Sequence, residues 1–183
     1  LMIGLGIVFA TFAVLSISAL NLANPGIMIV AMVSIITIPF VYSLFTYEES
    51  AYESDKFLGS NTLARHFPII VVLAGLFFGL IIGFTAWNLI LPPEQAKIMF
   101  GAQLAELSTI NSNFAGQVTA ITGQAVNLGS TQIEVFENLF IHNFQVLVLI
   151  ILFSLIYGAG AVLILAWNAS VIAVFLAGIA RQF

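Results

Sequence analysis

The chain lacks cysteine and carries very little charge. None of its 183 residues is Cys, and only 7% are Asp, Glu, Lys or Arg. The absence of cysteine excludes disulfides, thiolate metal sites and cysteine nucleophiles. A soluble domain normally has about 25% charged residues, so an ordinary water-soluble globule is excluded as well. Because Lys and Arg together number only 4, the chain has no basic patch for phosphate contacts, and nucleic acid is not an expected partner.

Apolar sequence is what the chain has in abundance. The hydrophobic fraction is 61% and the mean hydropathy is +1.15. A helix needs about 20 apolar residues to cross about 30 Å of hydrocarbon, and the charged residues divide the chain into runs of that kind. We therefore predict an all-α, polytopic transmembrane bundle, a single multi-pass domain of the cell membrane over residues 1–183. The predicted spans, about five, lie near residues 1–20, 27–47, 66–91, 139–158 and 160–181.

The few basic residues predict an orientation. The loop 48–65 contains two of the four bases, whereas the longer segment 92–138 contains only Lys97. The positive-inside rule then places loop 48–65 in the cytoplasm and segment 92–138 outside. Arg181, at the end of the fifth span, falls outside in this scheme and counts against it. The turn Asn21–Gly26, which contains Pro25-Gly26, predicts that the first two spans form an antiparallel hairpin.

The extracytoplasmic segment has an amphipathic pattern. Its apolar residues recur at steps of three and four, which indicates one stripe of a helix. We expect this stripe to cap the protein's own bundle; lying on the outer leaflet or binding a partner are the alternatives. The stripe comprises Ala96, Met99, Phe100, Leu104, Leu107, Ile110 and Phe114. Farther along, Thr131 and Glu134 match a capping box and predict a helix that begins near Thr131.

The third span contains a ridge of glycines spaced by four. Gly75, Gly79 and Gly83 share one helix face, and the missing side chains allow a second helix to approach closely. That second helix belongs either to the same protomer or to another copy in a homo-oligomer. Gly158 and Gly160, before the last span, are further candidates for close helix packing.

Several polar residues lie within or beside the last two spans and form a candidate polar intramembrane site. Its members are His142, Asn143, Gln145, Tyr157 and Asn168. Asn168 is surrounded by apolar sequence, where an unpaired amide is costly. The sequence Gly158-Ala159-Gly160 can break the helix and free backbone groups as partners. The alternative is interhelical hydrogen bonding that only fixes the bundle.

Catalytic motifs are missing. The chain has no HExxH or GxSxG sequence, and its two histidines, His66 and His142, lie at span boundaries. Because no Asp or Glu lies within a span, an intramembrane aspartyl protease and a carboxylate proton relay are both disfavoured. We therefore expect no enzymatic activity, no cofactor and no resident metal. A cytoplasmic cluster of Glu48, Glu49 and Glu53 with His66 is an alternative, but these groups are more readily explained as solvated boundary charges.

Several short segments resemble one known family. The most specific are the run 153–161, Phe-Ser-Leu-Ile-Tyr-Gly-Ala-Gly-Ala, and the run 166–172, Ala-Trp-Asn-Ala-Ser-Val-Ile. Weaker matches are Ile38-Pro39-Phe40, Glu48-Glu49, Arg65-His66, Phe77-Phe78-Gly79 and Ile141-His142-Asn143. Together these segments resemble the stage II sporulation protein M family in its archaeal-type branch, although that family usually has two asparagines where this chain has His142-Asn143.

The resemblance implies an all-helical membrane protein. The bacterial namesake anchors partner cell-wall hydrolases at the membrane during engulfment and is not itself the enzyme. Our first hypothesis is therefore a non-enzymatic multi-span scaffold that acts as a homo-oligomer and organises either the bilayer or partner membrane or envelope proteins. The second is a small-solute channel or transporter with a polar site around Asn143 and Asn168.

Overall fold

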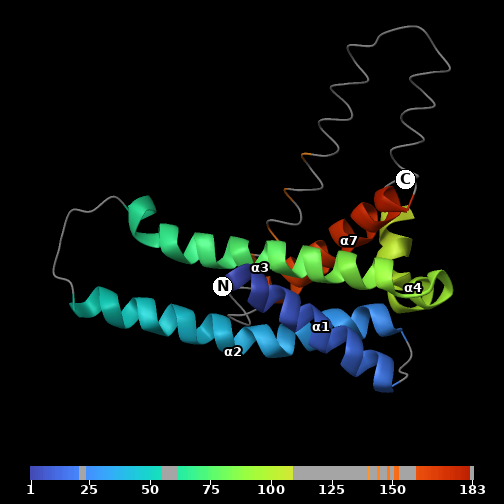
Figure 1. Ribbon diagram of the computed structural model, residues 1–183. Helices are drawn as coiled ribbons and strands as arrows, with labels where there is room; N and C mark the ends of the chain where they lie inside the picture. The colour runs from blue at the N-terminus through green and yellow to red at the C-terminus, as the bar shows by residue number, and fades with distance from the viewer. Residues whose placement is uncertain are drawn as a thin grey trace, which may run out of the picture.

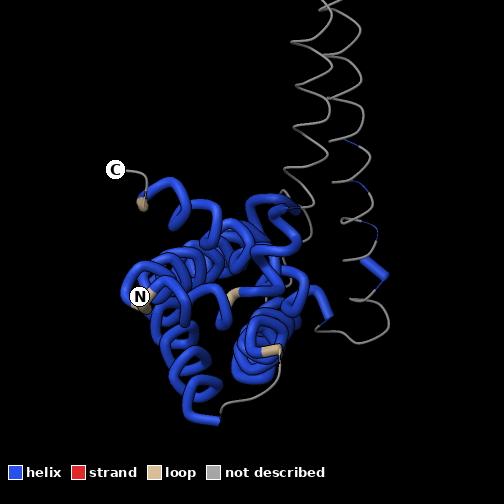
Figure 2. The backbone as a smooth tube through the Cα atoms, turned by 90° about the vertical axis from the view of Figure 1, so that its right-hand side faces the viewer, coloured by secondary structure: helices blue, strands red, loops and turns tan. Residues whose placement is uncertain are grey.

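The structure is a computed structural model that describes residues 1–20, 24–54, 62–108, 140, 144, 148, 151–152 and 160–181. Five helices have defined bounds in these ranges. They are α1 (Met2–Leu20), α2 (Pro25–Ser54), α3 (Thr62–Ile90), α4 (Pro93–Met99) and α7 (Gly160–Ala180). Residues 101–108 are also helical, and no described residue lies in a strand. The described chain is therefore all-helical (Figures 1 and 2).

Four of these helices are long and apolar enough to cross a membrane. The apolar segments are Met2–Leu20, Pro25–Thr46, Phe67–Ile90 and Gly160–Ala180, and between 28% and 39% of each is buried inside the protein. Most of the remaining surface is apolar, with Ile35, Phe78 and Phe175 among the exposed side chains. These helices coincide with four predicted spans; the prediction for 139–158 lies mostly outside the described residues.

Three of the four long helices run in the same direction. Gly6 of α1 lies beside Gly79 of α3, and Ala10 lies beside Gly83, so the two helices are parallel. Helices α3 and α7 also advance together, from the contact between Thr85 and Ala173 to that between Asn88 and Arg181. Helix α2 runs in the opposite direction and starts at the end where the other three finish (Figure 1).

The glycine ridge of α3 is occupied by α1 of the same chain. A Cβ atom built on Gly79 would lie 2.9 Å from the Cα atom of Gly6, and one on Gly83 would lie 2.7 Å from the Cβ atom of Ala10. At Gly75 it would meet Met2 at 3.0 Å. Of the two interpretations of this ridge, packing within one protomer is the one that these contacts support.

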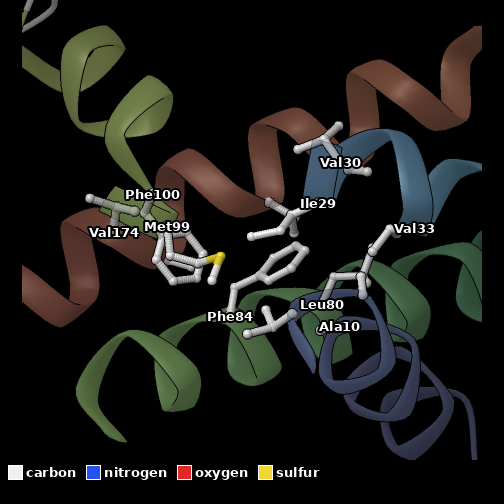
Figure 3. Close-up of a cluster of buried hydrophobic side chains, with 14 of the residues drawn as sticks. Ala10, Ile29, Val30, Val33, Leu80, Phe84, Met99, Phe100 and Val174 are labelled. Atoms are coloured by element: carbon white, nitrogen blue, oxygen red, sulfur yellow. The ribbon is translucent and has the colours of Figure 1, made fainter. Parts of the chain in front are cut away.

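The short helix α4 and residues 101–108 close one end of the bundle, which we call the capped end. Met99 and Phe100 are buried there and join a core contributed by α1, α2, α3 and α7. Phe84 of α3 stands at the centre, with Ile29 of α2 on one side and Leu80 on the other (Figure 3). The rings of Phe84 and Phe100 meet edge to face, with centroids 6.2 Å apart.

The amphipathic stripe therefore packs on the protein's own bundle over its first part. Ala96, Met99 and Phe100 are at most 8% exposed, and Leu107 packs against the core. Leu104 is an exception at 36% exposed. Ile110, Phe114 and the capping box at Thr131 lie outside the described residues.

Two predicted boundaries differ from the structure. Helix α2 continues through the acidic sequence to Ser54 and α3 already begins at Thr62, so helices occupy much of the predicted loop 48–65. Residues 48–54 contain no Gly or Pro that would end a helix. Pro25-Gly26 forms the first turn of α2 and is not part of the connecting turn, since Pro needs no N–H donor at that position. Asn24, just before it, has a positive φ of 53°.

Candidate functional site

The interior of the bundle contains few polar side chains, and we treat them as the candidate site. Among the described residues they are Ser34, Thr37, Asn88, Gln103 and Ser170, each at most 5% exposed. None of these side chains is ionisable, and the described residues contain no group of three or more His, Asp or Glu that could hold a metal ion. The described interior can therefore offer hydrogen bonds from neutral groups.

The buried hydroxyls differ in how they are satisfied. Ser34 donates to the carbonyl oxygen of Val30 at 2.8 Å, and Ser170 donates to that of Trp167 at 2.7 Å. Both bonds stay within one helix, as is usual for hydroxyls in apolar helices. The hydroxyl of Thr37 is fully buried and has no hydrogen-bond partner among the described residues. An unpaired group of this kind costs stability, so Thr37 is the most unusual polar residue of the interior.

Two polar contacts tie α3 to its neighbours. The indole Nε1 of Trp87 donates to the hydroxyl oxygen of Thr11 on α1 at 3.1 Å. The Thr85 hydroxyl donates to the carbonyl of Ile81 at 2.7 Å and lies 3.4 Å from the carbonyl of Ala173 on α7. Within a membrane such bonds supplement close packing, because lipid gives no hydrophobic drive between helices.

The end of α3 presents a buried carbonyl without a helical donor. Within a helix, the carbonyl of Asn88 would accept the N–H of residue 92, but residue 92 is proline and has none. Asn88 is only 5% exposed, so water has little access to it. The guanidinium group of Arg181, at the end of α7, donates to this carbonyl. Arg181 therefore caps α3 and joins the ends of two parallel helices.

Gln103 makes a second polar contact at the capped end. Its side-chain Nε2 donates to the carbonyl oxygen of Gly26 in the first turn of α2, at 2.9 Å. Its Oε1 atom is buried, and no described residue donates a hydrogen bond to it. A Cβ atom at Gly26 would lie 2.5 Å from Oε1 of Gln103, so a larger residue there would require the Gln103 side chain to move.

The structure describes only part of the predicted polar intramembrane site. Asn168 is half-buried on α7, and no hydrogen bond joins its side chain to the described residues. Gly160 is half-buried and begins α7. The other four members, His142, Asn143, Gln145 and Tyr157, lie outside the described residues, as does Gly158, which was predicted for helix packing. The predicted polar site therefore stays a prediction, with Asn168 as its one described member.

Sequence analysis missed the residues that do make cross-helix contacts. Gln103 and the pair Asn88–Arg181 make such contacts and are not part of any motif. Thr37 was also missed, although its buried hydroxyl makes no such contact with the described residues. One signal was available, since a proline four residues after Asn88 leaves that carbonyl without its helical donor. The donor itself could not be found in the same way, because Arg181 is separated from Asn88 by 93 residues.

No family model matches the chain, and comparisons with curated proteins and with solved structures found no significant match. The polar contacts described above hold helices together. Among the described residues no nucleophile lies beside a base, and no ionisable group lies in the interior.

Proposed function

We propose that the protein is a non-enzymatic multi-span membrane scaffold, in the cell membrane, that organises partner membrane or envelope proteins. The four apolar helices are compatible with a membrane protein. The resemblance to the stage II sporulation protein M family supports an anchoring role in place of catalysis. The remaining support comes from how tightly the described helices fill the space between them.

The closed interior is the observation that carries this proposal. Backbone meets backbone where Gly6 faces Gly79. Large side chains close the centre, since Phe84 and Phe100 are both 0% exposed. Alanines of α7 complete the packing, with Ala166, Ala169, Ala173 and Ala177 fully buried. Such packing leaves a solute no path among α1, α2, α3 and α7, whereas a transporter needs a polar cavity near the midplane.

A fifth crossing of the membrane is part of the proposal. Helices α3 and α7 run in the same direction, and residues 101–108 still lie at the capped end. The chain must therefore return to the opposite end before α7 begins at Gly160. A span near 139–158 would provide that return, and one crossing there gives the five spans expected from composition.

Site-specific photocrosslinking in cells tests the scaffold. A photoreactive amino acid at Ile98, which is 67% exposed on α4, should give a discrete adduct with a partner protein. Ile35 is a matched control, because it is the same residue type, 66% exposed on the apolar face of α2. We expect lipid adducts alone at Ile35. A scaffold that binds its partner through the capped end would be contradicted if no protein adduct formed at Ile98, nor at Glu94 or Glu106 of the same end.

A small-solute channel or transporter is the second candidate. The observation in its favour is Asn168, a half-buried amide in an apolar helix without a hydrogen bond to any described residue. Purified protein in vesicles would be tested for uptake of small neutral solutes by light scattering. Uptake that Asn168→Leu abolishes while the fold stays intact would support this candidate. Uptake no faster than in protein-free vesicles would leave the scaffold as the better account.

A homo-oligomer also belongs to the proposal, but the glycine ridge does not supply its interface, because α1 already covers that ridge. An interface between copies would have to use the outer apolar faces. The oligomeric state can be tested by measuring the mass of the protein in nanodiscs, without detergent, by mass photometry or analytical ultracentrifugation. A monomeric particle would remove the oligomer and leave the scaffold function to partner proteins.

A further inference from the structure

We infer that Arg181 is a latch that holds α7 against α3, and that α7 is the helix that moves when this latch opens. The inference goes beyond the scaffold function and does not depend on it. It rests on three observations about the capped end: the orphaned carbonyl of Asn88, the convergence of two helix ends, and the alanine-rich face of α7.

The carbonyl of Asn88 needs a donor from outside its own helix. Pro92 and Pro93 lack the N–H groups that would otherwise reach the carbonyls of Asn88 and Leu89. The next backbone N–H, that of Leu91, is already bonded to Trp87. Because Asn88 is buried, the guanidinium of Arg181 is the donor that the described structure supplies.

The ends of α3 and α7 also attract a cation electrostatically. Each helix has its partial negative charge at its C-terminus, where the last carbonyls have no helical partner. Since α3 and α7 are parallel, their C-terminal ends lie together beside Arg181. One guanidinium group therefore offsets two helix ends that would otherwise repel each other.

The rest of the contact between α7 and α3 depends on the close packing of small side chains. The buried face of α7 includes Ala166, Ala169, Ala173 and Ala177, whose side chains are single methyl groups. Separating the two helices would lose this packing but would not meet a hydrophobic penalty, because lipid is as apolar as the helix that it replaces. Besides the latch, the only hydrogen-bond contact described between the two helices is the 3.4 Å approach of Thr85 to Ala173.

The packing of α1 against α3 is different and provides an internal reference. There, backbone atoms meet directly at Gly6 and Gly79, and Trp87 adds a hydrogen bond to Thr11. Opening the latch should therefore release α7 and leave the α1–α3 pair unchanged.

Spin-label distance measurements on the full chain in lipid nanodiscs can detect this release. The chain has no native Cys, so labels at Ala86→Cys and Ile179→Cys report the α3–α7 distance near the latch. Labels at Val8→Cys and Ile82→Cys report the α1–α3 distance; all four positions are exposed. In Arg181→Ala we expect the α3–α7 distribution to broaden and shift to longer distances, while the α1–α3 distribution stays as in the wild type.

Rescue distinguishes a latch from a merely structural residue. Arg181→Lys, which keeps a cationic donor, should restore the narrow α3–α7 distribution. Guanidinium ion at low millimolar concentration should narrow the distribution of Arg181→Ala, and sodium at the same concentration should not. Lys97→Gln removes a charge from the same end, where Lys97 pairs only with exposed Glu94, and should change neither distance.

Two results would overturn the inference. The first is an α3–α7 distribution in Arg181→Ala that equals that of the wild type. If Arg181→Ala fails to fold, Arg181→Gln replaces it, because its neutral amide removes the charge but keeps a polar side chain. The second is broadening of both distances together in Arg181→Gln, which would make Arg181 a general fold determinant. Broadening of the α3–α7 distance alone supports the latch.

Discussion

Replacing Gly79 by alanine tests whether the close approach of α1 and α3 is required. The added Cβ atom would lie 2.9 Å from the Cα atom of Gly6 and closer still to the carbonyl oxygen of Ile3. Both neighbours are backbone atoms and cannot rotate away. We therefore expect overpacking to cost about 1–3 kcal/mol, partly offset by the higher helix propensity of Ala, which contributes about 1 kcal/mol.

Gly178→Ala is the matched control for this substitution. Gly178 lies in α7, and a Cβ atom there would have no atom within 4 Å. This variant gains the helix propensity without a clash, so it should be as stable as the wild type or slightly more stable. The difference between the two variants isolates the overpacking term, about 1–3 kcal/mol.

Unfolding by SDS in mixed micelles, followed by circular dichroism, would give both free energies. Gly6→Ala is a second variant to measure, because it adds a methyl group to the same contact from the side of α1. Once either alanine has pushed the helices apart, the second should cost less, so the double variant should be less destabilised than the sum of the single variants. Equal stability of Gly79→Ala and Gly178→Ala would refute the close contact between the two backbones.

Three further predictions concern single residues. Trp87→Phe removes the donor to Thr11 and should lower the unfolding free energy by about 0.6 kcal/mol, the average for a hydrogen bond between membrane helices. Thr37→Val removes a buried, unpaired hydroxyl and should raise the unfolding free energy by about 1 kcal/mol, the low end of the cost of such a group. In intact cells, a membrane-impermeant thiol reagent should label the Ser108→Cys variant, whose cysteine is at the capped end, and should not label the Ser54→Cys variant.

Controls exist for each of these. Trp167→Phe changes the same residue type at a half-buried position whose indole has no hydrogen bond to the described residues, so it should cost less than Trp87→Phe. Ser34→Ala removes a buried hydroxyl that is bonded to Val30, so it should not stabilise the protein. An unstable Thr37→Val would indicate that the hydroxyl has a partner in the membrane. Labelling of Ser54→Cys with protection of Ser108→Cys would invert the orientation.

The helical architecture was predictable because its cause is local. A run of about 20 apolar residues specifies a membrane-crossing helix wherever it occurs, and the predicted spans agree with α1, α2, α3 and α7. The end of α3 was predictable for a similar reason, since Pro92 and Pro93 cannot continue it. The course of α2 beyond Tyr47 was not, because charge predicts where the membrane ends and does not predict where the helix ends.

The candidate site was less predictable because its contacts join distant parts of the chain. The spacing of Gly75, Gly79 and Gly83 predicted that a helix packs there. It did not predict that this helix is α1. Likewise, Asn168 attracted attention as an amide in apolar sequence, although Thr37 is the more deeply buried unpaired group. Side-chain type is visible in a sequence, whereas burial depends on the tertiary arrangement.

The shared direction of α1, α3 and α7 has an electrical consequence. Each helix is equivalent to about half an elementary charge at either end. Helix α2 is antiparallel and cancels one of the three parallel helices. The four described helices together are therefore equivalent to about one elementary charge at either end, negative at the capped end. A membrane potential acts on such a dipole with up to about 2.3 kcal/mol per charge for each 100 mV. A cytoplasm at negative potential favours the capped end outside, the same side that Lys56 and Arg65 assign to it through the positive-inside rule. With the proposed return crossing antiparallel to α7, the helix dipoles would leave about half a charge at either end, and Arg181 at the capped end would offset part of it. The backbone would then favour the same direction of insertion as Lys56 and Arg65, by a correspondingly smaller amount.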